Sequence, residues 1–373
     1  MDRNLHIISL DIPYPVDYGG VFDLFFKIRA LHEAGIKIHL HCFEYGRTRQ
    51  EELNKYYANV FYYKRLQGIK AFSFRLPYIV NSRRNTVLLK NLLSNDYPIL
   101  LEGIHCSYLL TDERFNDRKI ILRLHNVEYA YYRELFRSTR SIYKKLYYAW
   151  ESKLLFRYEK SIARKVLIAA VSEQDILVYQ SKFKADKIIY LPVFLPYKMV
   201  SVLEGMGCYC LYHGNLSVPE NEKAAFWLLE NVFNDLETSF VIAGRNPSKH
   251  LKNAAAKRQS TCLVSNPSQE EMQDLITKAQ INILPSFNTT GIKLKVLNAL
   301  FNGRHCVVNK AAVTGTILAN TCHVGSGHAD LKSIITRLYH QSFSEEDLQL
   351  RRSLLEGMFE RSKNAQRLIQ WIW

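Results

Sequence analysis

The chain has 373 residues, of which 47% are hydrophobic and 23% are charged. This composition is typical of a globular protein and excludes a predominantly disordered or collagen-like chain, and the length predicts two domains. Lys and Arg number 50 against 35 Asp and Glu, so the net charge of +15 favours anionic partners such as phosphorylated substrates, nucleic acid or a negatively charged membrane face. No apolar run approaches the roughly 18 residues of a transmembrane helix, and the run within residues 1–11 is too short for a signal peptide. We therefore expect a cytoplasmic protein.

The first half of the chain alternates strand-like and helix-like segments. A strand is predicted over 5–11, and a turn containing Gly19 and Gly20 leads into a helix over 21–34, whose apolar residues recur at helical spacing. Further strands are predicted over 36–43, 59–63, 98–101, 119–124 and 166–171. This alternation predicts a parallel sheet with helices on both faces.

The pattern stops near 191–207, where prolines and glycines cluster, and we interpret this segment as a linker between two domains. The pattern then restarts as a second doubly wound α/β unit. Its strands are predicted over 208–213, 238–243, 261–265, 280–284 and 305–308, and its helices over 219–231, 268–278 and 291–302. The tail, 344–373, is predicted as one or two helices with an apolar end that must dock on another surface. We expect domains over 1–195 and 205–354.

Glycines and a histidine stand at predicted strand ends in the first half. Gly19 and Gly20 precede a helix, where glycine lets the backbone approach a phosphate or sugar. The alternative is an ordinary tight turn. His125 directly follows the strand over 119–124 and could bond a sugar hydroxyl or polarise a reacting group, although a structural histidine is also expected at such positions. In two wound domains that face each other, ligands bind in the cleft at these strand ends.

The second half repeats this arrangement at two neighbouring strand ends. Gly214-Asn215 and Gly244-Arg245 each place a glycine before a polar residue, which suits close approach to a ligand.

The loop after the strand over 280–284 carries the densest group of candidates. A polar stretch leads to a predicted helix start near Gly291, where free backbone N–H groups could bind a diphosphate together with Lys293 and Lys295. Asn298 could reach ribose hydroxyls. The alternative is a helix capped by a threonine such as Thr290, with solvated lysines. The candidate residues of this loop are Thr290, Gly291, Ile292, Lys293, Lys295 and Asn298.

Taken in order, these motifs resemble the retaining GT-B glycosyltransferases of the large Glu-x7-Glu, nucleotide-sugar family (group 1, family 4-like). The resemblance spans nearly the whole chain. The matching residues are Pro13-Tyr14-Pro15 with Gly19-Gly20, His125, Val171-Ser172-Glu173-Gln174-Asp175, Gly214, Gly244, and the "GIKLK" loop Gly291–Leu297.

The resemblance implies two Rossmann-like domains that face a central cleft. The N-terminal domain would bind the acceptor, the C-terminal domain the nucleotide-sugar, and a final helix over 355–373 would pack back on the first domain. It also implies that His125 contacts the donor sugar in the active site. Lysines, arginines and a helix N-terminus would stabilise the leaving diphosphate, so no metal and no cofactor are expected. A zinc spacing is also missing from the seven scattered cysteines.

The sequence departs from the family at four positions. Thr290 and Asn298 stand where the two glutamates are usual, and Asn215 and Glu220 stand where the family often has a diphosphate-binding arginine and lysine. We therefore expect Lys293, Lys295 and Arg245 to bind the diphosphate.

The stretch from Tyr129 to Lys165 is both basic and aromatic, with ten Lys or Arg against three Glu. One interpretation is a long core helix with a solvated basic face. Another is a helix on an anionic membrane or at a lipid-linked acceptor. Nucleic-acid binding is the weakest alternative, because no recognised binding signature accompanies it.

The sequence thus predicts a metal-independent glycosyltransferase of the hexosyltransferase type. It would act in cell-surface polysaccharide synthesis on a glycan or lipid-linked acceptor, with the inner membrane face as its peripheral position. Three alternatives stay open: a non-catalytic GT-B module that binds a nucleotide or glycan, a nucleotide-sugar epimerase, and a basic nucleic-acid binder. The base, sugar, acceptor and linkage are not predicted.

Overall fold

The computed structural model describes residues 3–16, 19–44, 46–139 and 141–373. It divides into two compact units, unit 1 (Met1–Pro196 with Phe359–Trp373) and unit 2 (Tyr197–Met358). The boundary lies within the predicted linker, and 197–204 belong to unit 2. None of the helices in the described ranges combines the length and hydrophobicity that a membrane span requires.

Unit 1 is built on a seven-stranded, all-parallel sheet with the order β3-β2-β1-β4-β5-β6-β7. Its strands are β1 (Asn4–Ser9), β2 (Lys37–Glu44), β3 (Asn59–Lys64), β4 (Ile99–Glu102), β5 (Ile120–Leu124), β6 (Leu167–Ala170) and β7 (Ile188–Tyr190). Six of them were predicted from apolar runs. The short strand β7 was not, because three residues carry too little pattern to separate a strand from a loop.

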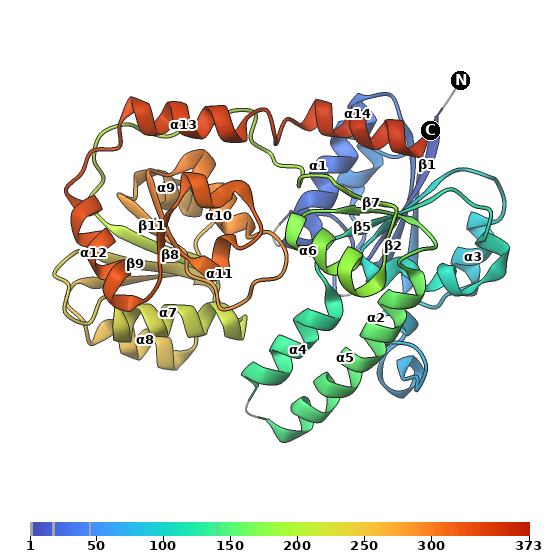
Figure 1. Ribbon diagram of the computed structural model, residues 1–373, viewed down its shortest axis with the longest axis horizontal. Coiled ribbons are helices and arrows are strands. Elements are labelled where there is room, and N and C mark those ends of the chain that lie inside the picture. The colour runs from blue at the N-terminus through green and yellow to red at the C-terminus, as the bar shows by residue number, and fades with distance from the viewer. Residues whose placement is uncertain (1–2, 17–18, 45, 140) are drawn as a thin grey trace. The chain divides into compact units, whose positions relative to one another are not determined.

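Helices cover both faces of this sheet. They are α1 (Gly19–Glu33), α2 (Tyr78–Asn81), α3 (Thr86–Leu92), α4 (Glu128–Ser138), α5 (Ile142–Ile162), α6 (Glu173–Val178) and α14 (Arg361–Ile372). Successive residues of β1 point to opposite faces, so Ile7 packs in the core beneath α1 and α14 while Ile8 packs in the core on the other side. The C-terminal helix starts at Arg361 rather than 355, and its buried Leu368 and Ile372 lie in the same cluster as Leu24 of α1 (Figure 1).

The basic stretch 129–165 forms two helices and not one long helix. Figure 1 shows α4 and α5 as a pair that extends away from the unit 1 sheet, with α2 near α5. Helix α4 ends at Ser138 and is followed by the extended Thr139, and α5 begins at Ile142 with Ser141 as its N-cap residue. One side of α5 is buried, through residues that include Leu155, Tyr158 and Ile162.

Unit 2 contains a six-stranded, all-parallel sheet with the order β10-β9-β8-β11-β12-β13. Its strands are β8 (Cys210–Asn215), β9 (Phe240–Arg245), β10 (Thr261–Ser265), β11 (Ile281–Ile283), β12 (His305–Asn309) and β13 (His323–Gly325). Its helices are α7 (Pro219–Asn231), α8 (Lys249–Ala256), α9 (Gln269–Lys278), α10 (Leu294–Asn302), α11 (Lys310–Val313), α12 (His328–Tyr339) and α13 (Glu345–Leu355). The doubly wound, parallel α/β architecture predicted for each half is confirmed.

The helix predicted over 291–302 starts three residues later, at Leu294. Gly291 has a φ of +63°, a left-handed conformation that cannot continue a helix and that glycine adopts most readily. Lys293 is the extended N-cap residue, and its side chain does not cap the helix. Residues 291–293 therefore belong to the loop that leads into α10.

Both sheets reverse their strand order beside their first strand. In unit 1 the reversal lies between β1 and β4, and in unit 2 between β8 and β11. The connections leave in opposite directions at such a point and open a crevice at the carboxyl ends of the strands. The residues at these strand ends are therefore the first place to look for a site in each unit.

Candidate active site

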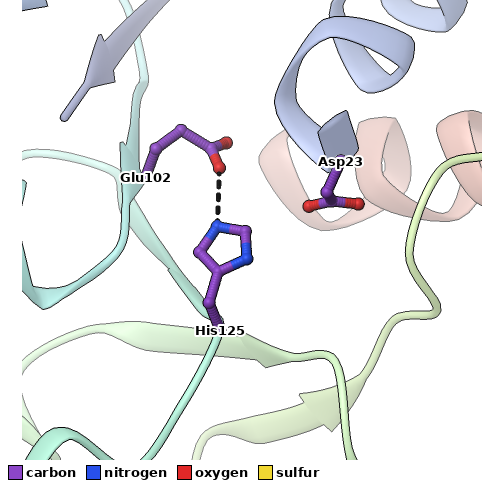
Figure 2. Close-up of side chains that lie close together, drawn as sticks. All are labelled: Asp23, Glu102 and His125. Atoms are coloured by element: carbon purple, nitrogen blue, oxygen red, sulfur yellow. Dashed lines mark hydrogen bonds and ion pairs between the residues drawn. The ribbon is translucent and has the colours of Figure 1, made fainter. Parts of the chain in front are cut away.

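His125 directly follows β5, as predicted, and stands beside the carboxylate at the end of β4. Its Nε2 lies 3.1 Å from Oε2 of Glu102, and Figure 2 shows this contact with Asp23 of α1 across from the ring. The His125 side chain is 19% exposed, whereas that of Glu102 is buried. The imidazole is thus oriented by a buried partner while part of its ring remains accessible.

A buried network of charged side chains surrounds Glu102 and Asp23 and holds the Glu102–His125 pair in place. The Lys27 ammonium lies 3.0 Å from Oδ2 of Asp23 and 2.8 Å from Oε1 of Glu102. The Arg123 guanidinium donates to both oxygens of Asp23, at 2.9 and 3.1 Å. The backbone N–H of Phe194 donates to Asp23 Oδ1 at 2.7 Å. The network ties α1 to β4 and β5, so it fixes where His125 stands.

The two carboxylates of this network stay ionised. Burial raises the pKa of each, but Arg123 and Lys27 hold the pKa of Asp23 well below its ordinary value. Lys27 and the hydrogen bond from His125 likewise hold the pKa of Glu102 below its ordinary value. Oxygen and nitrogen atoms of Asp23, Glu102 and His125 lie within 4.8 Å of one another, a spacing that could hold a metal ion. Here the Lys27 ammonium contacts both carboxylates, which gives them a cationic partner without a metal.

The contact with Glu102 decides what His125 offers to a ligand. A carboxylate only accepts hydrogen bonds, so Nε2 of His125 must carry the proton of this contact. In the neutral ring, Nδ1 is then an acceptor. A sugar hydroxyl is a suitable donor to such a nitrogen.

In unit 2, the predicted glycines and polar residues of β8 and β9 are paired side by side. Gly214 pairs with Gly244 and Asn215 with Arg245, so all four lie at the last two positions of their strands rather than after them. A Cβ on Gly244 would lie 2.0 Å from the carbonyl oxygen of Gly214, and one on Gly214 would lie 3.3 Å from Cγ of Asn221. Packing between neighbouring strands and against α7 therefore already accounts for both glycines.

Lys295 lies in the first turn of α10 and reaches toward β8 and α7. Its Nζ lies 3.2 Å from Oδ1 of Asn221 and 3.4 Å from the hydroxyl of Tyr212, and it sits 4.9 Å from the centre of the Tyr212 ring. Among the described residues, no carboxylate comes within ion-pair distance of this ammonium. Burial lowers the pKa of Lys295 to about 8, although the nearby Glu220 raises it. The half-buried cation thus contacts neutral oxygen atoms.

His213 is buried beside this lysine. It is 5% exposed, and burial together with the Lys295 charge lowers its pKa to about 3, so its ring is neutral. Its Nε2 has no hydrogen-bond partner among the described residues. His213 ends the strand predicted over 208–213, but only the following Gly214 and Asn215 were predicted as site residues, because local sequence does not show that His213 lies beside Lys295.

The other predicted loop residues have partners inside the loop or its helix. Thr290 donates to Asn288 Oδ1 from its N–H and its hydroxyl, at 2.7 and 2.8 Å. Lys293 Nζ donates to the Thr290 carbonyl at 2.6 Å. Asn298 Oδ1 accepts from Asn302 at 2.8 Å. Ile292 is half-buried in the loop.

Most of the predicted unit 2 residues thus lie together at the carboxyl ends of three neighbouring strands, because β9 and β11 both flank β8. In unit 1, α1 begins at Gly19, so Gly19 and Gly20 open the helix, as predicted. The side chains that sequence analysis missed are those of the charge network. The sequence does contain a sign of them, because charged residues stand among apolar ones. Asp23 and Lys27 lie one turn apart on a buried face of α1, and Arg123 lies within an otherwise apolar strand.

Comparisons with known proteins found a family model and a relative that match this chain. The family model of glycosyl transferases group 1 matches residues 207–340. A Klebsiella pneumoniae protein, described as an uncharacterized 44.6 kDa protein in the cps region, is 30% identical over 334 residues, which cover 83% of this chain and 84% of that protein.

Solved structures share the fold at low sequence identity. The crystal structure of an S. aureus TarM mutant in complex with Fondaparinux, alpha-GlcNAc-glycerol and UDP matches this chain with a TM-score of 0.67. The two sequences are 10% identical, and the match covers 99% of each chain. A glycosyltransferase from Rickettsia africae gives 0.64 at 12% identity, over 100% of this chain and 98% of that one. WaaG, a glycosyltransferase involved in lipopolysaccharide biosynthesis, gives 0.59 at 12% identity, over 98% and 95%. The predicted family is confirmed: this chain belongs to the group 1 glycosyltransferases and has the GT-B fold.

Proposed function

We propose that this glycosyltransferase moves a sugar from a nucleoside-diphosphate donor, with retention of anomeric configuration, to a glycan or lipid-linked glycan. Unit 2 binds the donor and unit 1 the acceptor. The observation that carries the proposal is the Lys295 ammonium, which is half-buried at the start of α10 and contacts only neutral oxygens among the described residues. A cation in this setting is suited to an anionic ligand.

The diphosphate is the part of the donor that this region recognises. Lys295 contacts the amide oxygen of Asn221 at 3.2 Å, and a phosphate oxygen is the stronger partner because the contact is then between opposite charges. The side chain of the N-cap residue Lys293 does not cap α10, so we propose that the N–H groups of its first turn and the positive end of its dipole add to this charge. Lys293 and Arg245 complete the proposed phosphate contacts. These groups stabilise the leaving diphosphate in our account, and we propose no role for a metal ion.

His125 acts on the sugar in this proposal. Its Nε2–H is engaged by Glu102, so Nδ1 accepts a hydrogen bond from a hydroxyl of the transferred sugar and orients it for transfer. Because Lys27 and Arg123 fix Glu102 and Asp23, the imidazole is preorganised before the substrate binds. We assign no nucleophile, and the front-face displacement that the family resemblance implies needs none.

We place the reaction in cell-surface polysaccharide synthesis, on the inner face of the membrane. Support comes from the relative described as a protein in the cps region and from the structural likeness to WaaG. A lipid-linked acceptor would be found at that surface, which suits a basic protein.

The proposal is tested by donor turnover in two variants. The nucleotide that the protein binds is first identified by titration. Purified protein is then incubated with sugars linked to that nucleotide, with and without glycan acceptors, and NMR determines the anomeric configuration of the product. Lys295→Met is expected to weaken nucleotide binding, whereas His125→Ala is expected to lower the turnover number and leave nucleotide affinity unchanged. Lys252→Met, on the exposed face of α8, is the matched control. Equal turnover in all three variants would contradict the assignment.

A second candidate is a non-catalytic module that binds a nucleotide or glycan. It is favoured by Thr290 and Asn298, whose side chains bond to Asn288 and Asn302 rather than presenting carboxylates. Hydrolysis of the donor to free sugar, even slow, would exclude this module. An epimerised donor in the absence of acceptor would indicate a nucleotide-sugar epimerase instead.

A further inference from the structure

Two segments of unit 1 present large apolar side chains to solvent. On α5, Tyr143 is 87% and Leu146 66% exposed, and with Trp150 they recur at helical spacing along one face. In the segment before α2, Ile69 is 92% and Phe74 74% exposed. We call the whole set the apolar edge, and its members are Ile69, Phe72, Phe74, Ile142, Tyr143, Leu146 and Trp150. Exposure on this scale is unusual for a surface that stays in water.

Specific contacts join the two segments into one surface. The Phe74 ring lies edge-on to Trp150 at 6.2 Å between centres, and Phe72 lies edge-on to Phe74 at 4.9 Å. One residue along α5, the buried Glu151 carboxylate accepts a hydrogen bond from the backbone N–H of Tyr78, at the start of α2. The segment that carries Phe72 and Phe74 is therefore held against α5.

A groove lined by positive charges lies between α4, α5 and the segment Tyr179–Phe183, which carries Lys182. It has a volume of about 410 Å³ and is floored by rings that include Tyr129 and Phe156, which stand edge-on at 5.2 Å. Its remaining lining consists of Phe136, Ala149, Ser152 and four cations, and no carboxylate contributes. We call it the basic groove, and its cations are Arg133, Lys153, Arg157 and Lys182.

The acidic residues of this hairpin do not compensate these cations. Glu128, Glu151 and Glu159 are buried, and Glu159 accepts from the backbone N–H groups of residues 128 and 129 at the start of α4. Glu134 pairs with Arg137 at 2.5 Å. The outer side of the hairpin therefore carries a strong excess of positive charge beside an apolar edge.

We propose that this surface docks on a bilayer of anionic phospholipid, with the apolar edge in the interfacial layer and a lipid phosphate in the basic groove. Charge complementarity selects this occupant, because aromatic and aliphatic side chains flanked by Lys and Arg match the layered chemistry of an anionic membrane face. A second copy of the chain would bring like charges together. A polynucleotide would gain nothing from Ile69 or Leu146, which have no ring to stack on bases. The inference specifies the surface behind the membrane position proposed above, and it does not depend on sugar transfer.

Vesicle sedimentation tests the proposal with the full chain. Vesicles of equal parts phosphatidylglycerol and phosphatidylcholine are expected to bind the protein, and pure phosphatidylcholine vesicles to bind it at least about tenfold more weakly. Neutralising the groove (Arg133→Gln, Lys153→Gln, Arg157→Gln, Lys182→Gln) is expected to lower partitioning at least about tenfold. A matched variant that loses the same charge at exposed sites elsewhere (Lys119→Gln, Lys187→Gln, Lys252→Gln, Lys257→Gln) should lose much less.

Tryptophan fluorescence tests the apolar edge separately. Binding should shift the emission of Trp150 to the blue, and Trp150→Phe should abolish most of that shift while circular dichroism stays unchanged. Equal loss in the groove variant and its matched control would overturn the proposal, as would equal binding to both vesicle types. Binding to single-stranded RNA without binding to vesicles would overturn it in favour of a nucleic-acid partner. Nucleotide affinity is measured in parallel and should not change in the groove variant, so a failure here is distinguishable from a failure of the proposed function.

Discussion

Replacing Lys295 by methionine removes one positive charge and preserves most of the side-chain length. The ammonium now contacts Asn221 and Tyr212 at 3.2 and 3.4 Å, both through neutral oxygens, so its charge is available to a phosphate. A charge-assisted hydrogen bond contributes about 1.5–3 kcal/mol, and each 1.4 kcal/mol is about tenfold in the dissociation constant. We therefore expect Lys295→Met to weaken nucleoside-diphosphate binding by roughly 10- to 150-fold.

Calorimetric titration measures this loss, and two further readouts separate it from misfolding. Urea unfolding should show no loss of stability, because the substitution removes a half-buried charge that has no carboxylate partner. Affinity of the unmodified chain should fall between pH 7 and pH 9, because burial lowers the pKa of Lys295 to about 8 and the lysine loses its charge as the pH rises. The variant should lack this pH dependence. Affinity within twofold of the unmodified chain in both Lys295→Met and Lys293→Met would refute the reasoning.

Three further predictions concern stability. Arg123→Met should cost about 3–5 kcal/mol, because Asp23 stays buried and keeps Lys27 but loses both guanidinium hydrogen bonds; urea midpoints measure this, and Arg114→Gln in the exposed pair with Asp112 should change little. Burial and the neighbouring Glu159 raise the pKa of Glu128 from 4.5 to about 8. The stabilisation from this retained proton is full below pH 4.5 and is lost as the pH rises through 8. Glu128→Gln should therefore flatten the fall in urea midpoint over that window, and an unchanged slope would count against a buried neutral carboxyl. Leu368→Ala should cost about 2–5 kcal/mol, because it opens a cavity between α14 and the unit 1 core; Gln370→Ala on the exposed side of α14 is its control, and equal midpoints would mean that α14 is not docked.

Most strands of both sheets could be predicted because parallel strands are buried on two faces and appear as continuous apolar runs. The segment 120–124 is such a run, and His125 was correctly predicted to follow directly after its last residue. The short strands Ile188–Tyr190 and His323–Gly325 gave no comparable pattern, whereas Ile281–Ile283 lies within the longer predicted strand 280–284. The start of α10 was misjudged because the left-handed Gly291 and the extended Lys293 are conformations that no apolar spacing reveals.

The site was harder to predict than the fold because its contacts join distant segments. Arg123 and Asp23 are 100 residues apart in sequence, and the contact between Lys295 and Asn221 spans 74. Local patterns identify a charged residue in an apolar setting but not its partner. The family resemblance supplied His125 and the loop before α10. It did not supply the network that orients His125, which required the packing of α1 on the sheet.

The central claim is that unit 2 binds the nucleoside diphosphate of a sugar donor. The most direct test is a calorimetric titration of the purified chain with UDP, GDP, ADP, CMP and dTDP, each with and without a chelator. The account predicts selective binding of one nucleoside diphosphate, with an affinity that the chelator does not change and that Lys295→Met weakens. A folded chain that binds none of the five would contradict the account, and binding that disappears with the chelator would contradict its proposal that lysines and a helix N-terminus neutralise the phosphate.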